Sequence, residues 1–345
     1  MAYTTINKST DYFNTKLYTG NGSAGNAQTG VGFKPDWLWI KNRTNAQEHW
    51  LADIVRGTTK FIESNSNNAE SSDGATGLAS FDSDGFTVNG SARTNQNSES
   101  MVAWNWLAGG SQGSSNTDGS INTTYTSVNT TAGFSISKYT GTGSNATVGH
   151  GLGVAPSMIL FKNLSSARNW IVYHKSVGET KNLYLDLQNA ENTSSTTFQD
   201  TAPTSTVFSI GTSVGVNESG DDIIAYCFAE KTGYSKFGVY QGNSNADGAF
   251  IYTGFKPAFI NIKAKSRSES WYMFDNKRIG RNPDNEQLYS DATSTEATTD
   301  YIDILSNGFK LRQNNVGLNG TGETYVYMAF GQSLVGTNDI PCTAR

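Results

Sequence analysis

Gly32-Phe33-Lys34-Pro35-Asp36-Trp37-Leu38-Trp39-Ile40-Lys41 is a Gly-x-x-Pro step followed by a run of apolar residues that ends in lysine. The same pattern recurs at residues 153–162 and 254–263. Because proline cannot donate a hydrogen bond into a central β-ladder, the step is typical of a turn that leads into a buried strand. A pattern that returns at long intervals indicates a repeat architecture and bears on every other motif in the chain.

Further landmarks accompany each copy of this stretch. A glycine turn precedes it, and an apolar strand ending in an aromatic residue closes the copy. These landmarks are Gly20 and Trp106, Gly141 and Phe228, and Gly242 and Phe330. The glycine and the aromatic residue are 86, 87 and 88 residues apart in the three copies, a drift too small to be chance. Because turn signals separate short strand candidates within each copy, the sequence predicts an all-β fold of three tandem small antiparallel β-sandwich units.

The landmarks also predict how the chain is divided. We expect repeat units at residues 16–107, 137–230 and 236–331, an N-terminal docking segment at 1–15 and a C-terminal tail at 332–345. Gly141 follows Trp106 by 35 residues, whereas Gly242 follows Phe228 by only 14. The longer joint, residues 108–136, is rich in Gly, Ser and Thr and predicts a flexible linker with one extra strand-like piece. The two terminal segments are too short to fold alone, so we expect them to become ordered only on assembly.

The composition favours a folded β protein without strong charge. Hydrophobic residues make up 36% and charged residues 16% of the sequence, the net charge is −5, and 7 Trp, 16 Tyr and 17 Phe are present. A disordered chain would combine few aromatic residues with a high net charge. The sequence has no cluster of Lys and Arg, which argues against nucleic acid and anionic membrane surfaces as partners.

The sequence also bears on where the protein is made. Residues 1–10 do not have a basic region followed by an apolar run, so we expect no signal peptide, and no apolar stretch reaches the roughly 18 residues needed to span a bilayer. Cys227 and Cys342 are too few for a disulfide framework. We therefore expect synthesis in a reducing cytoplasm and no membrane insertion.

The triplication provides an internal control for candidate sites, because a residue type shared by all copies is structural and a chemical site is more often confined to one copy. Residues 20–25 match the pattern Gly-x-Gly-x-x-Gly, but a Trp-rich strand follows in place of the helix that a dinucleotide site needs. Residues 82–85, Asp-Ser-Asp-Gly, resemble the start of a calcium loop, but the third copy has a turn without carboxylates there. A β-turn is the better interpretation.

The residues that could carry catalysis are similarly unpromising. The three histidines, His49, His150 and His174, are not at metal-ligand spacing, and Cys227 lies inside a closing strand, as expected of a buried thiol. Asp221-Asp222 and the pair Asp300 and Asp303 are the local carboxylate clusters, and both are interpreted as solvated strand edges. We expect no catalytic residues, no cofactor and no metal, and therefore no enzyme. A polysaccharide depolymerase is kept as an alternative, because the sequence does not exclude a facing carboxylate pair.

The tryptophans give one candidate contact residue. Trp50, Trp170 and Trp271 recur at the start of a strand, so we expect them to be buried at equivalent places. In the preceding strand, Trp37 is apolar in every copy, whereas the residue matching Trp39 is Asn261 in the third copy. Trp39 is therefore the candidate for an exposed ligand contact or for burial against a neighbouring unit.

Two stretches carry a family resemblance. The run from Thr117-Asp118-Gly119-Ser120-Ile121 through Ala132-Gly133-Phe134-Ser135-Ile136 to Tyr139-Thr140-Gly141, and the ending Phe330-Gly331-Gln332-Ser333-Leu334, resemble segments of virion structural proteins of marine tailed bacteriophages, including cyanophages. The Gly-Phe-x-Pro and Val-Ala-Trp-Asn-Trp segments of the first unit fit the same group, so the resemblance spans all three units.

The resemblance implies a tandem-repeat β-sandwich protein of the particle surface, fibre-like and oligomeric, with a trimer favoured. It implies no catalytic residues. We therefore expect a virion structural protein, a tail-fibre or receptor-binding component that adheres to a host surface glycan or outer-membrane component. The alternative is a capsid decoration or other architectural subunit whose partners are other virion proteins.

Overall fold

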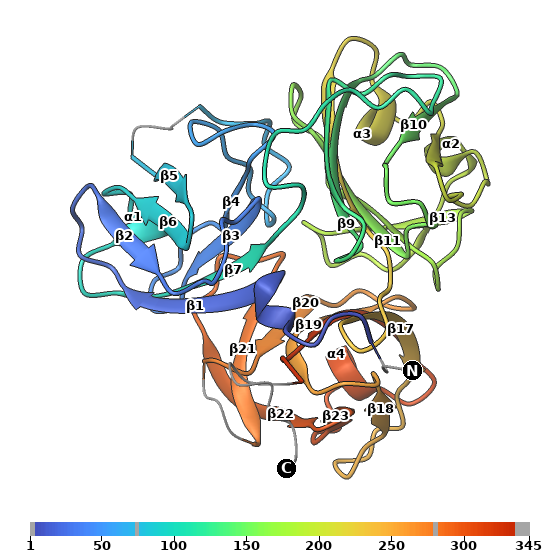
Figure 1. Ribbon diagram of the computed structural model, residues 1–345. Coiled ribbons are helices and arrows are strands. Elements are labelled where there is room, and N and C mark those ends of the chain that lie inside the picture. The colour runs from blue at the N-terminus through green and yellow to red at the C-terminus, as the bar shows by residue number, and fades with distance from the viewer. Residues whose placement is uncertain (1–3, 73–75, 279–281, 335–345) are drawn as a thin grey trace.

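The computed structural model describes residues 4–72, 76–278 and 282–334, and it confirms the predicted all-β, antiparallel, sandwich-like fold. Figure 1 shows three lobes around a common centre, blue to cyan, green, and orange to red in chain order. We call them the first segment (residues 13–106), the second segment (107–228) and the third segment (229–331). The helices within the described residues are single turns.

The first segment follows a short 3₁₀ turn, η1 (Ser9–Asp11). Its elements are β1 (Phe13–Thr19), β2 (Asn26–Thr29), β3 (Trp37–Asn42), β4 (Trp50–Asp53), β5 (Leu78–Asp82), β6 (Gly85–Val88), α1 (Ala92–Asn95) and β7 (Ser100–Trp106).

The second segment has the elements β8 (Tyr125–Asn129), β9 (Phe134–Thr140), β10 (Ala146–Gly149), β11 (Met158–Asn163), β12 (Ile171–His174), β13 (Lys181–Tyr184), β14 (Asn192–Thr193), α2 (Ser195–Phe198), β15 (Val207–Ile210), α3 (Val214–Asn217) and β16 (Asp222–Phe228).

The third segment has the elements β17 (Ser235–Gln241), β18 (Phe250–Tyr252), β19 (Pro257–Ala264), β20 (Trp271–Asp275), β21 (Asp284–Tyr289), β22 (Ala297–Leu305), β23 (Gly308–Leu311), α4 (Val316–Asn319) and β24 (Thr324–Gly331).

One strand order recurs in the three segments: β1-β7-β3-β4, β9-β16-β11-β12 and β17-β24-β19-β20. A smaller group of strands covers the outer face of each of these sheets, namely β2-β6-β5, β10-β15 and β18-β23-β22. In the third segment β21 and β22 join the two layers into one continuous ladder. The recurring order agrees with the predicted repeat, whose exact unit boundaries stay a prediction.

Alternation along the strands gives each main sheet two buried faces. The outer faces pack under the smaller strand groups in three separate apolar cores. The inner faces of all three sheets meet in a single central core. Aromatic rings dominate it: Trp37 stacks on Tyr226 of the second segment with ring centroids 4.7 Å apart, and Phe228 lies 5.9 Å from Phe330 of the third. Each segment therefore has an outer core of its own and shares the central core with the other two.

The three junctions between segments use the same contacts in turn. At each junction a ring N–H of one segment lies against a backbone carbonyl of the preceding segment in the ring. The pairs are Trp170 Nε1 with Glu63 O (2.8 Å), Trp271 Nε1 with Tyr184 O (2.7 Å) and His49 Nε2 with Tyr289 O (3.0 Å). Because the last pair joins the first and third segments, the contacts close a ring.

A buried lysine supports each junction in the same way. The lysine that ends the repeated stretch donates from Nζ to a carbonyl four residues beyond the carbonyl just described. These bonds are Lys41 to Thr293 O (3.0 Å), Lys162 to Asn67 O (3.3 Å) and Lys263 to Gln188 O (2.8 Å). All three lysines are fully buried, and burial lowers the pKa of each to about 8.

The register corrects one alignment made from the sequence. Trp50, Trp170 and Trp271 are all buried as predicted, but Trp50 is not equivalent to the other two. Trp271 pairs with Lys263, whereas Trp50 pairs with Ile40 and stacks on Phe61 in the outer core. The residue before it, His49, occupies the position of the other two tryptophans. Because an alignment on tryptophan pairs Trp50 with Trp170 and Trp271, it is shifted by one residue in the first segment, where His49 is the equivalent residue.

Two segments outside the predicted units are more ordered than the sequence suggested. Residues 108–136 contain the expected extra strand, β8, but they are not a free tether, because β8 pairs with β9 and the Gly110 amide donates to Asp36 Oδ2 (2.7 Å). In the N-terminal segment, Ile6 is buried in the central core and β1 begins at Phe13, before the predicted boundary. Residues 1–3 and 335–345 lie outside the described residues.

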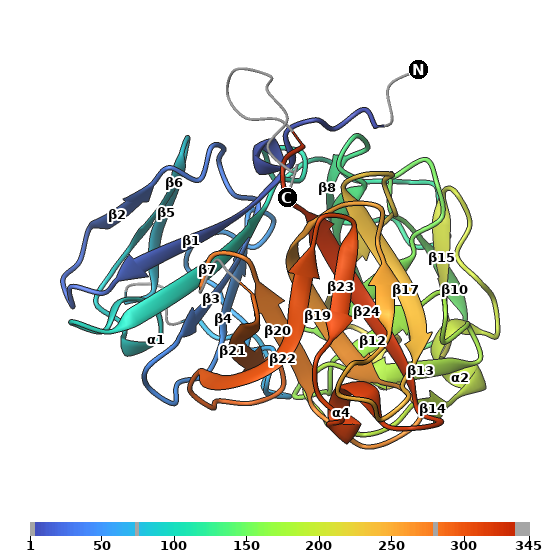
Figure 2. The same ribbon diagram turned by 90° about the horizontal axis from the view of Figure 1, so that it is seen from below.

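The described ends of the chain lie together. The Leu334 amide donates to Asn7 O at 2.9 Å, and the Thr10 amide donates to Ser333 Oγ at 3.2 Å. Figure 2 shows η1 and the end of β24 at the same end of the molecule. Thus the N-terminal segment and the start of the C-terminal tail are packed against each other.

Candidate ligand groove

Trp39, the contact residue proposed from the sequence, is fully buried in the central core. It shares the inner face of β3 with Trp37, as residues two apart in a strand do. Its Nε1 donates to His49 Nδ1 at 2.7 Å. An exposed ligand contact is therefore excluded, and burial at a junction between segments is what the structure shows.

His49 links this tryptophan to the third segment. Because Nδ1 accepts from Trp39, the ring proton is on Nε2, which can donate to Tyr289 O (3.0 Å) and Ala292 O (3.2 Å). Burial lowers the pKa of His49 well below its usual value. His49 thus serves as a neutral connector between segments.

The other sequence candidates also have structural roles. β2 follows the glycine pattern at residues 20–25 directly, and Asp84 accepts from the Gly30 and Gly32 amides at 2.9 and 2.7 Å in a turn. Asp221 accepts from Asn163 (2.9 Å), Asp222 pairs with Lys138 (2.7 Å) and Asp303 with Arg312 (3.3 Å).

The thiol and the metal ligands complete this survey. Burial raises the pKa of the Cys227 thiol far above its usual value, which suits a core residue. In the described ranges, no group of three or more His, Cys, Asp or Glu side chains lies where it could hold a metal ion.

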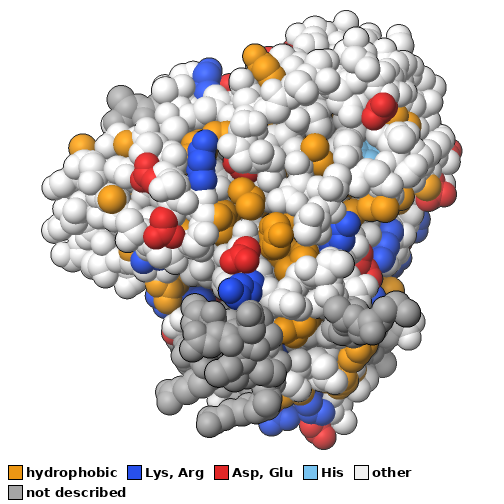
Figure 3. Space-filling view, in the orientation of Figure 1, with side chains coloured by type: hydrophobic (Ala, Val, Ile, Leu, Met, Phe, Trp, Pro, Cys, Tyr) orange, Lys and Arg blue, Asp and Glu red, His pale blue; other side chains and the backbone are white. Residues whose placement is uncertain are grey.

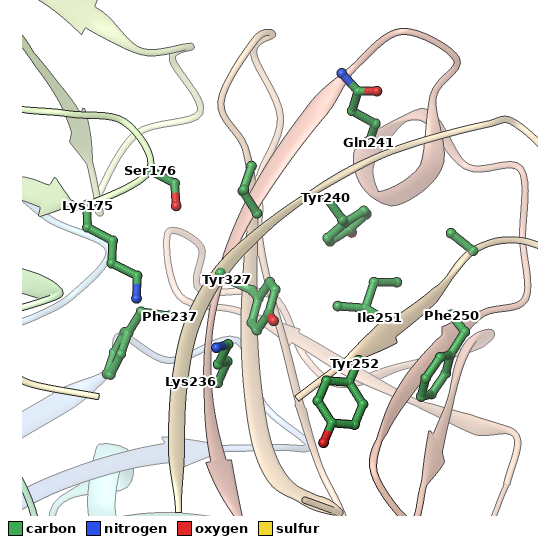
Figure 4. Close-up of a pocket in the computed structure, with 13 residues that line it drawn as sticks. Lys175, Ser176, Lys236, Phe237, Tyr240, Gln241, Phe250, Ile251, Tyr252 and Tyr327 are labelled. Carbon is green, nitrogen blue, oxygen red and sulfur yellow. The ribbon is translucent and has the colours of Figure 1, made fainter. Parts of the chain in front are cut away.

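A groove of about 510 Å³ opens between β17 and β18 in the third segment. Its walls carry three of the most exposed large apolar side chains, namely Val239 (48% exposed), Phe250 (44%) and Tyr252 (59%). Figure 4 shows Tyr252 and Phe250 on one side and Lys175 and Lys236 on the other, with Tyr327 between them. An exposed apolar cluster of this kind on a rigid sheet is typical of a binding site.

The floor of the groove depends on one glycine. Tyr327 lies opposite Gly238 in the β17–β24 ladder, and a Cβ on Gly238 would lie 2.4 Å from Tyr327 Oη. The corresponding pairs in the other segments are Lys16 with Ala103 and Ser137 with Ala225. Only the third segment therefore combines a large ring with a glycine that leaves room for it.

The same register comparison applies to the wall. Phe250 and Tyr252 flank Ile251, which pairs with Phe309, the repeated Phe of the third copy. The counterparts of the two aromatic residues are Ala27 and Thr29 in the first segment and Thr147 and Gly149 in the second. The aromatic wall is thus confined to one copy. Aligning the chain on the repeated Phe would have found it from the sequence.

The basic end of the groove is partly neutralised. Lys175 and Lys236 both pair with Glu230, at 2.7 and 2.8 Å. Burial alone would raise the pKa of Glu230, but the two lysines lower it below the usual range. The groove therefore offers aromatic and aliphatic surface and backbone groups, beside a basic end at which two lysines share one carboxylate.

The described part of the face seen in Figure 3 has no large patch of one charge. Lys and Arg lie scattered among Asp and Glu, and hydrophobic side chains lie near the centre. Among the described residues, the longest helical runs are too short and too polar to cross a membrane.

Comparison with known proteins gives a family without an assigned activity. The chain belongs to the family described as a domain of unknown function (DUF7483), whose model matches residues 8–333. That range includes all three segments. No curated protein matches the chain.

Proposed function

We propose that this member of the DUF7483 family is a non-enzymatic structural protein of a virus particle that holds a partner in the groove of its third segment. The observation that carries the proposal is the groove itself, with Val239, Phe250 and Tyr252 exposed around a preformed floor. The rest of the molecule fits a scaffold, because its sheets share one core and its junctions close a ring.

The assignment to a virion rests on the sequence resemblance to structural proteins of marine tailed phages. Within that setting we favour a tail-fibre or receptor-binding component over a capsid decoration. An apolar groove with an aromatic wall suits adhesion, in which many weak contacts on one particle combine and raise avidity by roughly 10²–10⁴. The depolymerase alternative gains no support, because the described residues that line the groove include no Asp or Glu, and the adjacent Glu230 is bound between two lysines.

We also propose a homotrimer, as the sequence resemblance implies, although the fold does not require one. Three sheets of a single chain already bury one another's inner faces, so an oligomer is not needed to cover them. Light scattering of the purified protein measures the assembly directly. A trimer in solution would support the fibre-like arrangement. A monomer would have only one groove for adhesion.

The groove is tested by removing its aromatic wall. Phe250→Ala combined with Tyr252→Ala should weaken binding to host envelope preparations, or to particles lacking the protein, by at least tenfold. Val214→Ala and Val316→Ala are matched controls, because these valines are similarly exposed (46% and 44%) but lie outside the groove. Binding that is equal in the double variant and the controls would contradict the proposal. Electron microscopy of particles with labelled protein then separates tail from capsid.

A further inference from the structure

The two strands that border the groove both have a free edge. β17 pairs with β24 and β18 with β23, and in the described parts of the chain no further strand pairs with the outer edge of β17, which has a bridge between Lys231 and Ser235 at its start and a bond from the Phe237 amide to Glu230. Strand edges with unpaired N–H and C=O groups are templates for a further strand.

The direction of the β17 backbone groups follows from its first residues. The Ser235 amide donates to Lys231 O (2.9 Å), and the Phe237 amide points to Glu230 Oε2 (3.4 Å), so both face away from β24. Backbone groups alternate along an antiparallel strand, so Val239 and Gln241 also direct their N–H and C=O outward. These outward groups lie beside the exposed side chains of the groove.

The second segment shows what fills such a space. There the corresponding strands are β9 and β10, and the chain from Ser114 to Asn129 pairs with both of them. The Ile121 amide donates to Thr147 O in β10 (3.0 Å), and the Thr124 amide donates to Lys138 O in β9 (2.7 Å). β8 then continues along β9. We call residues 114–129 the plug.

The strand register shows that the groove beside β17 corresponds to the space that the plug fills beside β9. Lys138 pairs with Ile224 and Val239 pairs with Val326, at the same point of the closing strand, and Val148 and Ile251 pair with the repeated Phe208 and Phe309. The short joint before the third segment, 14 residues from Phe228 to Gly242, leaves no chain for a second plug. The third segment thus has the acceptor without the strand.

We propose that the groove accepts an extended strand of a second polypeptide, which pairs with the outer edge of β17 and lays its apolar side chains against Phe250 and Tyr252. The inference rests on the proposed function and specifies its partner. The plug defines the chemistry of the strand, which is rich in Ser, Thr and Asn, nearly uncharged, and carries isolated apolar residues such as Ile121 and Val128. Main-chain bonds give such strand addition its affinity, and side-chain pockets give its specificity.

A synthetic peptide with the sequence of residues 114–129 is the probe. Labelled with a fluorophore, it should bind the full-length protein saturably, as measured by fluorescence anisotropy. In the plug the Thr126 amide points to Ser114 O, so the amides of Tyr125 and Ser127 face β9. The same peptide N-methylated at these two residues should bind at least tenfold more weakly. Equal binding of the two peptides would overturn the proposal without any change to the protein.

The protein side is tested by Val239→Pro, which removes one outward amide and leaves the β17–β24 bonds in place. Peptide binding should fall at least tenfold, with Val214→Ala as the control and an unchanged circular dichroism spectrum as evidence of folding. If Val239→Pro leaves both peptide binding and adhesion intact while the Phe250 and Tyr252 double variant abolishes adhesion, the partner is a glycan or another ligand. The proposed function would then stand and the strand proposal would fall.

Discussion

The second and third segments have the same pair of sheets, but one edge of the sandwich is covered in the second segment and uncovered in the third. In the second, the plug pairs with β9 and β10 and covers the edge. In the third, β17 and β18 face each other across a groove with exposed aromatic residues. The joint before the second segment is the longer one, 35 residues against 14 between the same landmarks. A difference in connection length, rather than in fold, therefore decides which edge is available to a partner.

The largest effect is expected where the two segments are alike, in the central core. Trp170→Ala and Trp271→Ala each remove a fully buried indole that also donates across a junction. Each should lower the free energy of unfolding by about 3–5 kcal/mol, measured by chemical denaturation. The two costs should agree within about 1 kcal/mol, given the same contacts. A much smaller cost for either variant would show that the junctions are not equivalent.

A smaller effect should distinguish the covered edge from the open one. Ile121 of the plug is nearly buried, at 9% exposed, whereas Val239 is 48% exposed. Ile121→Ala should therefore cost about 2–3 kcal/mol, and Val239→Ala less than about 0.5 kcal/mol. Thermal and urea unfolding measure both. Similar costs would mean that the plug does not contribute to the second core.

Proline substitutions sharpen the same contrast at the backbone. Lys138 pairs with Tyr125 of β8, so Lys138→Pro leaves a plug carbonyl without its donor and should cost about 1–3 kcal/mol. Val239→Pro removes an amide that faces solvent and should cost less than about 1 kcal/mol. The difference between the two free energies of unfolding is the quantity to measure. A larger cost for Val239→Pro would indicate that β17 is already paired in the isolated protein.

A pH dependence is expected in all three segments, whether the edge is covered or open. Burial lowers the pKa of Lys41, Lys162 and Lys263 to about 8, compared with about 10.4 in an unfolded chain. Between these values the unfolded state binds more protons, so each lysine should raise the free energy of unfolding with pH, by at most about 1.4 kcal/mol per pH unit. Below about pH 8 the buried lysines are charged, and the cost of burying these charges lowers the free energy of unfolding in full. As pH rises above 8, the lysines lose their protons in the folded state and this cost decreases.

Lysine variants isolate this contribution. Cys227, whose pKa burial raises, acts in the opposite direction above about pH 8.5, so the slope of each variant must be compared with that of the unmodified protein. Lys162→Met and Lys263→Met should each reduce the lysine-dependent slope by one third, whether the edge is covered or open. Denaturation at several pH values between about 7.5 and 9.5 tests this. Unchanged slopes would show that the lysines keep their charge.

The sequence predicted the strands better than it predicted the contacts between the three segments. The Gly-x-x-Pro step and the closing strand were sufficient for an antiparallel all-β fold, because alternation and turn residues act locally. The convergence of three inner faces on one core depends on contacts between residues more than 200 positions apart, such as Phe13 with Phe330. No local pattern reports such contacts, so Trp39 was considered for a ligand although it lies in that core.

The groove was missed for a different reason. Attention to shared residues favoured the tryptophans, whereas Phe250 and Tyr252 are specific to the third segment. The internal control pointed in the right direction, since it states that a chemical site is more often confined to one copy. The linker was misjudged because Gly and Ser predict flexibility only where no free strand edge is close by. Here β9 offers such an edge, and β8 pairs with it.

The closed ring of junctions has a consequence for synthesis. The first segment presents Trp37, Trp39, Trp104 and Trp106 to the central core, and its junction with the third segment includes the bond from the Glu296 amide to Arg43 O. At a ribosomal rate of roughly 5–20 residues per second, Glu296 emerges about 10–50 s after Arg43. During that interval Trp104 and Trp106, which pack against Phe259 of the third segment, do not have their full set of partners. A nascent chain of this kind should depend on chaperones, and fragments that end after the first or second segment should aggregate rather than persist as folded intermediates.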